Sequence, residues 1–163
     1  LLIAGPPASG KTTVSKILKE RLGDIPMVDF GRLREFHLKP DWSNQSEEEE
    51  QMAFENLLCI LDNYEKHGYK YVIVNDLKDK RVVSFPRVFS GSFKIFTLTV
   101  DDSVLSNRIN DPTRDSGFIE IEAASKWNKH VKERDAVENE YKIDNSHSDP
   151  EKTVQEILSK LSE

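Results

Sequence analysis

The chain has 163 residues, of which 37% are hydrophobic and 32% are charged, a balance too apolar for a disordered chain. The length suits one domain, so we expect residues 1–163 to form a single one. The formal charge of −6 disfavours binding to nucleic acid polymers or anionic membranes, and no apolar run is long enough to cross a bilayer. A small-molecule partner is therefore expected.

The chain begins inside an apolar run, Leu1 to Ala4, which predicts a buried parallel strand. We also expect an initiating segment before Leu1. A glycine-containing loop follows over residues 5–13. The apolar residues after it recur at helical spacing and predict a helix that ends at Gly23. These residues are Val14, Ile17, Leu18 and Leu22.

A second strand is predicted over Pro26 to Phe30, before a charged stretch. The acidic run that starts at Ser46 has capping-box spacing to Glu49, and its carboxylates complement a helix dipole, so it predicts a helix start. The pattern ends at Gly68. Cys59, the single cysteine, is predicted to be a small buried side chain of this helix. It has no internal disulfide partner, which fits a reducing, cytoplasmic location.

Three further strands and three helices complete the prediction. The strands are Tyr71 to Val74, Phe93 to Val100, and Tyr141 to Ile143. Asp102 is predicted to cap a helix that begins near Ser103, and Ala124, Trp127 and Val131 to form the packed face of the next helix. The last helix opens at Ser148 or Asp149, before Pro150, with its buried face at Val154, Ile157, Leu158 and Leu161.

The regular alternation of strands and helices indicates an α/β fold with a parallel sheet that is covered on both faces.

The loop "GPPASGKTT" satisfies the pattern G-x-x-x-x-G-K-[ST] between a predicted strand and a predicted helix, as a P-loop requires. Small residues let backbone N–H groups converge on phosphate oxygens, and the helix dipole attracts the negative charge. Lys11 is predicted to reach the β- and γ-phosphates of ATP, and Thr12 to ligate Mg²⁺. The predicted nucleotide-binding residues are Gly5, Pro6, Pro7, Ala8, Ser9, Gly10, Lys11, Thr12 and Thr13.

The chain resembles the small P-loop kinases, a group that includes nucleoside monophosphate kinases and shikimate kinase. The segments that carry the likeness are "GPPASGKTT", "VDFGRLREF", "YKYVIVND", "RINDPTRDSG" and "IDNSHSDPEKTVQEIL". The resemblance implies a three-layer P-loop NTPase fold with a five-stranded parallel sheet in the order 2-3-1-4-5. It also implies transfer of the γ-phosphoryl group of ATP to a small acceptor, an acceptor-binding segment at about residues 31–66, and a short lid at about residues 108–120.

Acceptor-binding residues are expected just past the second strand, because ligands of α/β sheets bind outside the carboxyl ends of the strands. By resemblance, Asp29 orients or deprotonates an acceptor hydroxyl, and Arg32 or Arg34 binds an acceptor anion. A solvated, charged helix start is the alternative.

The strand "YVIV" predicts a carboxylate that holds the magnesium shell through water. Asn75 comes first and Asp76 second, whereas many relatives place the acid immediately after the apolar run. Asp76 is the candidate, with a turn aspartate as the alternative.

By resemblance, Arg108 and Arg114 are lid residues that neutralise charge during transfer, with Gly117 as a hinge. Surface ion pairs with neighbouring aspartates are the alternative. Arg134 is a weaker third candidate for this role, and a solvated helix residue is the favoured interpretation.

Asn145 lies where related kinases place the adenine ring, although a turn and helix cap would fit as well. The four histidines have no metal-ligand spacing. Trp127 is predicted to pack in the core.

The leading prediction is an ATP- and Mg²⁺-dependent kinase for a small metabolite, nucleoside or nucleotide. The alternative is a nucleotide-binding module or NTPase switch without a phosphorylated acceptor. A GTPase is disfavoured because the chain lacks an N-K-x-D segment.

Overall fold

The sheet at the centre of the molecule has five parallel strands in the order β2-β3-β1-β4-β5, as expected. The computed structural model describes residues 1–36, 46–113, 118–147 and 149–162. The strands are β1 (Leu2–Ala4), β2 (Met27–Asp29), β3 (Ile73–Asn75), β4 (Ile95–Thr99) and β5 (Glu140–Asp144). Because all five strands run in the same direction, their carboxyl ends share one edge of the sheet.

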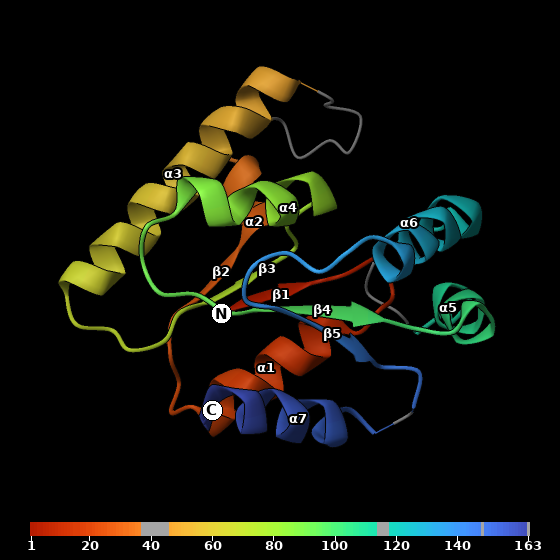
Figure 1. Cartoon of the computed structure of the whole chain (residues 1–163). Helices are drawn as coiled ribbons and strands as arrows, with labels where there is room; N and C mark the ends of the chain where they lie inside the picture. The colour runs from red at the N-terminus through yellow and green to blue at the C-terminus, as the bar shows by residue number, and fades with distance from the viewer. Residues whose placement is uncertain (37–45, 114–117, 148, 163) are drawn as a thin grey trace.

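Helices cover both faces of this sheet, which makes three layers (Figure 1). One face carries α2, α3 and α4, the other carries α1 and α7, and α5 and α6 lie toward the carboxyl ends of the strands. The bounds are α1 (Lys11–Arg21), α2 (Phe30–Arg34), α3 (Glu47–Lys66), α4 (Asp79–Val88), α5 (Asp102–Ile109), α6 (Ile121–Glu133) and α7 (Pro150–Ser162). The predicted α/β class with helices on both faces is confirmed.

Alternating residues of β1 divide the core into its two halves. Leu2 and Ala4 pack with Phe54 of α3, whereas Ile3 packs with Val14 of α1 and Val154 of α7. Successive side chains of a strand point to opposite faces, so a short apolar run supplies both halves. All three β1 side chains are at most 2% exposed.

Helix α3 begins as the sequence predicts. The Ser46 Oγ accepts a hydrogen bond from the Glu49 backbone N–H at 3.3 Å. The prediction that Cys59 is buried was wrong, because Cys59 is exposed. The buried stripe of α3 includes Leu57 and Leu61, and a residue two positions from each lies on the opposite side of the helix.

Two predicted boundaries are corrected, and one helix was not predicted. Phe30 begins α2 instead of ending β2, because the Asp29 side chain caps that helix. Helix α5 begins at Asp102 with Asp101 as its N-cap residue, since the Asp102 carboxylate accepts from Asn128. Helix α4, which contains Pro86, was not predicted.

Arg134 is the centre of a closed charged cluster, so the prediction of a solvated side chain was wrong. Its guanidinium donates to Glu140 at 2.7 Å and to Asp79 at 2.9–3.1 Å. The side chains of Arg134 and Glu140 are 11% and 0% exposed. We call Arg134, Asp79 and Glu140 the Arg134 cluster. It joins the end of α6 to the starts of α4 and β5.

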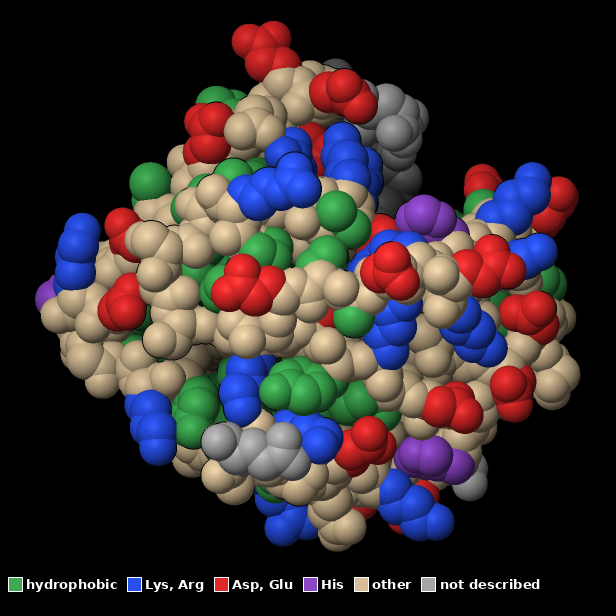
Figure 2. Space-filling model, in the orientation of Figure 1, with side chains coloured by type: hydrophobic (Ala, Val, Ile, Leu, Met, Phe, Trp, Pro, Cys, Tyr) green, Lys and Arg blue, Asp and Glu red, His purple; other side chains and the backbone are tan. Residues whose placement is uncertain are grey.

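Acidic and basic side chains are intermingled over the face of the molecule that Figure 2 shows. Among the described residues, no helix is both long and apolar enough to span a membrane.

Candidate active site

The loop between β1 and α1 has the conformation of a phosphate cradle. Gly5 and Gly10 adopt φ angles of 134° and 97°, which residues other than glycine rarely adopt. A Cβ on Gly5 would stand 2.4 Å from the Leu98 carbonyl oxygen, and one on Gly10 would stand 2.4 Å from Asn145 Nδ2. The two fixed glycines of the motif are therefore required by backbone conformation and by close packing.

The amino end of α1 has no side-chain cap and no acidic residue in its first turn. The first N–H groups of a helix lack intrahelical partners, and the helix dipole makes them attractive to anions. Thr12 and Thr13 are exposed at this end and line the adjoining groove. The start of α1 thus offers donors to a phosphate group.

Asn145 and Arg108 hold the loop in place from outside. Asn145 is 3% exposed, and its Nδ2 donates to the Ser9 carbonyl at 2.7 Å, while Thr153 donates to its Oδ1 at 2.6 Å. The Arg108 guanidinium donates to the carbonyl of Ala8 at 3.4 Å and to that of Asn145 at 2.9 Å. Burial lowers the pKa of Arg108, and the Asp144 charge opposes this shift.

Arg108 therefore lies between the loop and the β5–α7 connection. Asn145, predicted to lie beside an adenine ring, contacts the loop through its side chain.

Lys11 folds back over the loop. Its Nζ donates to the carbonyls of Gly5 and Pro6, both at 3.0 Å, and stands 4.0 Å from the Asp76 carboxylate. The side chain is 11% exposed. These contacts place the Lys11 Nζ atom beside the phosphate cradle.

Asp29 and Asp76 converge on Gly31. A Cβ on Gly31 would lie 2.7 Å from an Asp76 oxygen and 3.1 Å from an Asp29 oxygen, so a larger residue there would require the carboxylates to shift. The Asp29 Oδ1 accepts from the Arg32 backbone N–H at 3.0 Å. Asp76 has a φ of 64°, a conformation that non-glycine residues adopt rarely and often at functional sites.

Burial raises the pKa of Asp76, and the neighbouring charge of Asp29 raises it further. The charges of Lys11 and Arg34 act in the opposite direction. The pair thus carries negative charge that internal contacts only partly compensate.

One groove with a volume of about 1670 Å³ connects these residues. It is larger than the pockets of roughly 300–1,000 Å³ that hold typical single ligands, so it has room for two substrates. The predicted site residues that line it are Pro7, Ala8, Gly10, Lys11, Thr12, Thr13, Asp29, Arg32, Asp76, Arg108 and Asn145.

The remaining predicted residues are placed differently. Arg34 does not belong to the residues that line the groove, although its charge acts on Asp76. Arg114 and Gly117 lie outside the described residues, as does part of each predicted segment, residues 31–66 and 108–120. The roles assigned to all of these side chains stay predictions.

Asn75 and Trp127 are among the groove residues that sequence reasoning did not assign to the site. Asn75 is 3% exposed, and its Oδ1 has no hydrogen-bond partner among the described residues. Trp127, predicted to pack in the core, is only partly buried and lines the groove. For Asn75, the available signal was a polar residue directly after a predicted buried strand. For Trp127 there was no such signal, because the spacing of apolar residues in this helix predicts core packing.

The residues present fit a nucleoside triphosphate with Mg²⁺. The glycine cradle and the uncapped start of α1 can both face phosphate oxygens. The Ser9 hydroxyl of the same loop is buried and has no hydrogen-bond partner in the described chain. Thr12 and Asp76 offer the oxygen ligands that Mg²⁺ accepts, directly or through water.

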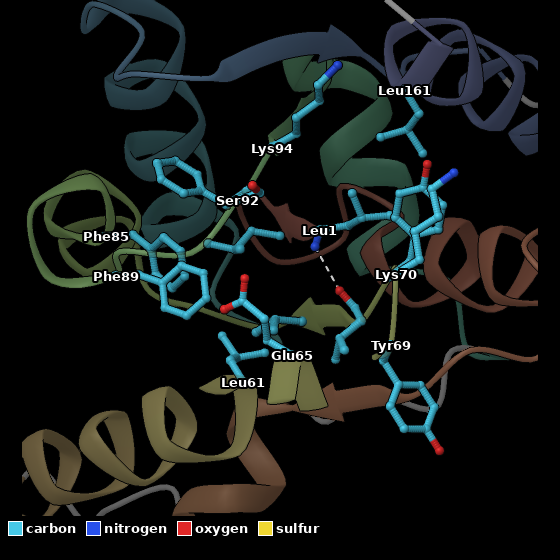
Figure 3. A pocket seen from close by; sticks show the side chains of 15 residues that line it. Leu1, Leu61, Glu65, Tyr69, Lys70, Phe85, Phe89, Ser92, Lys94 and Leu161 are labelled. Carbon is cyan, nitrogen blue, oxygen red and sulfur yellow. Dashed lines mark hydrogen bonds between the residues drawn. The ribbon is translucent and has the colours of Figure 1, made fainter. Parts of the chain in front are cut away.

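A second cavity of about 260 Å³ lies elsewhere, beside the start of β1 (Figure 3). Phe85, Phe89 and Leu61 line it, and the Leu1 amine donates to the Val72 carbonyl at 2.7 Å. None of the predicted site residues that the structure describes lines this cavity.

Comparison with solved structures finds kinases of the same fold. A gluconokinase from Sinorhizobium meliloti 1021 is 16% identical, with 99% of this chain and 90% of that chain covered at a TM-score of 0.73. A shikimate kinase from Bacteroides thetaiotaomicron is 15% identical, with 99% and 97% covered at a TM-score of 0.64.

The tunicamycin resistance protein of Deinococcus radiodurans is 17% identical, with 99% and 94% covered at a TM-score of 0.75. The predicted resemblance to small P-loop kinases is thus confirmed at the level of the fold. A search of curated proteins gave no match. The family model that matches residues 1–140 is described as an AAA domain, and because it covers most of the chain, the protein belongs to that family.

Proposed function

We propose that this protein is an ATP- and Mg²⁺-dependent kinase that phosphorylates a hydroxyl or phosphate group of a small metabolite, nucleoside or nucleotide. The observation that carries the proposal is the shared groove. It joins the phosphate cradle and Lys11 to the carboxylates of Asp29 and Asp76. The kinase names of the structural neighbours support the same activity.

Each side chain has a role that its position supports. The N–H groups at the start of α1 bind the phosphate tail, and Lys11 neutralises charge that develops on the transferred group. Thr12 and Asp76 hold Mg²⁺, which when bound offsets the negative charge between the phosphates. Asp29 orients the acceptor hydroxyl or takes its proton, because its Oδ2 accepts no hydrogen bond from the described residues.

Arg32 and Arg108 border the groove at two places. Arg32 is exposed there and suits an anionic group of the acceptor. Arg108 supports the loop through backbone carbonyls, so its contribution is to keep the cradle in shape. With no covalent intermediate, catalysis rests on positioning and charge neutralisation.

The test is ADP formation from MgATP across a panel of sugars, hydroxy acids, nucleosides and nucleoside monophosphates. A kinase forms ADP at a rate that rises at least tenfold with one class of acceptor, and the phosphorylated product appears in equal amount. Equal ADP release with and without every acceptor would instead identify an NTPase. Nucleotide binding without ADP release would identify a binding module.

A further inference from the structure

Helix α6 contributes one residue, Trp127, to the lining of the groove. At its start, Ile121 packs against the same apolar cluster as Ala8 of the phosphate loop. Just past its end, Arg134 binds Asp79, which lies three residues after Asp76. The helix therefore runs from the phosphate loop to the connection that follows β3.

Trp127 is the central residue of this helix. Ala124 and Val131, on either side of it along the same face, are fully buried. The Trp127 side chain lines the groove that the phosphate loop, Asn75 and Asp76 also line. The indole and the Asp76 carboxylate therefore belong to the same groove.

The Trp127 Nε1 atom is buried and has no hydrogen-bond partner in the described part of the chain. An indole N–H can only donate, so its partner must carry an acceptor atom such as an oxygen. Leaving such a donor unsatisfied costs about 1–3 kcal/mol. A buried donor of this kind in the wall of a substrate groove suits a ligand oxygen.

We propose that Trp127 binds the phosphoryl acceptor, an inference that rests on the proposed kinase activity. The indole N–H donates to an oxygen of the acceptor molecule, and the ring packs against its carbon skeleton. The favoured acceptor therefore has a hydrogen-bond-accepting oxygen beside an apolar face, in addition to the group that is phosphorylated.

The position of Trp127 favours the acceptor over the nucleotide. The phosphate loop is held from the β5 side by Asn145 and Arg108. Trp127 instead belongs to α6, and Arg134 just past the end of that helix binds Asp79, three residues after Asp76.

The variant Trp127→Phe tests the hydrogen bond because it keeps an aromatic ring and removes the donor. With the best acceptor of the panel, kcat/KM for the acceptor should fall about 10- to 100-fold, the loss expected when a substrate oxygen loses its partner. KM for MgATP should stay within twofold. The thermal midpoint should not fall, because the change removes an unsatisfied buried donor.

The matched control is Lys126→Gln, one residue away on α6, where the side chain is 76% exposed and pairs with Glu122. It should leave all three measurements unchanged. An unchanged acceptor kcat/KM in Trp127→Phe would overturn the inference. A rise in KM for MgATP alone would do so too, because it would assign the indole to the nucleotide.

Tryptophan emission separates this inference from the kinase assignment. In a Trp42→Phe protein, Trp127 is the remaining tryptophan. Its emission should change when a panel acceptor is added in the presence of MgADP, even if no acceptor is phosphorylated and the proposed activity fails. Emission that no panel compound changes, or that responds to MgADP alone, would overturn the role of Trp127.

Discussion

Two charged clusters lie close together in the chain and differ in how their charges are compensated. In the Arg134 cluster, hydrogen bonds of 2.7–3.1 Å join side chains that are at most 13% exposed. In the groove, Lys11 and Asp76 are 4.0 Å apart, and Asp76 is 47% exposed. Only two residues separate Asp76 from Asp79.

The difference shows two uses of the same kinds of side chain. In the Arg134 cluster every partner is internal, and hydrogen bonds from Arg134, Thr97 and the Val137 N–H outweigh burial to lower the pKa of Glu140. In the groove, burial and Asp29 raise the pKa of Asp76. Closed clusters join elements of the fold, whereas incompletely compensated charge is typical of a site that awaits a ligand.

The largest effect is expected for Lys11→Ala. Turnover with MgATP and the best acceptor should fall by about 100-fold or more, because the variant lacks the cation at the phosphate cradle. The thermal midpoint should change little, since Lys11 contributes no core packing. Lys19→Ala, on the same helix, is the control and should keep full turnover. Wild-type turnover in Lys11→Ala would show that the groove lysine is not catalytic.

The next effect is expected for Glu140→Ala. Removing one partner of a buried ion pair leaves Arg134 uncompensated, so the free energy of unfolding should fall by about 3–5 kcal/mol in urea titrations. Glu138→Ala, at an exposed position two residues away, should have little effect. Equal stability of the two variants would show that the Arg134 cluster does not stabilise the fold.

The pH dependence of unfolding sharpens this prediction. Because the pKa of Glu140 is lowered in the folded protein, its contribution is present above the usual value of 4.5 and is lost as the pH falls below it. The stability difference between wild type and Glu140→Gln should therefore shrink in acid. A difference that does not change from pH 7 to pH 3 would contradict this role of the carboxylate.

The smallest effect compares one substitution at two aspartates. Asp76→Asn should raise the thermal midpoint slightly, because the ionised carboxylate with its raised pKa opposes folding at pH 7 and asparagine tolerates a positive φ. Asp79→Asn should lower the midpoint, because it weakens the contact with Arg134. The gain at Asp76 should diminish as the pH falls and aspartate becomes protonated. Two shifts of the same sign would remove the distinction between the clusters.

Much of the fold could be predicted because its signals are local. The loop at residues 5–13 combines glycines that need positive φ with a helix start, and the strands are short apolar runs. Ser46 capped α3 as predicted, because a capping box spans only four residues. Helix α4 was missed because Pro86 lies inside its last turn, where the expected helical pattern is interrupted.

The partners of individual side chains could not be predicted in the same way. The local sequence around Arg134 is charged and therefore predicts an exposed side chain. Its burial depends on Asp79, which lies 55 residues earlier in the chain. The position of Trp127 in the groove likewise depends on where α6 packs against the rest of the fold. Contacts between distant segments follow from how the layers pack, and the spacing of residues within one segment does not predict them.

By itself, the sequence determined the phosphate loop, the parallel sheet and the candidate side chains at the strand ends, since these depend on backbone conformation and on periodicity over a few residues. Only the tertiary structure decided which charges compensate one another internally and which face the groove. That choice depends on desolvation and on distances between segments far apart in the chain.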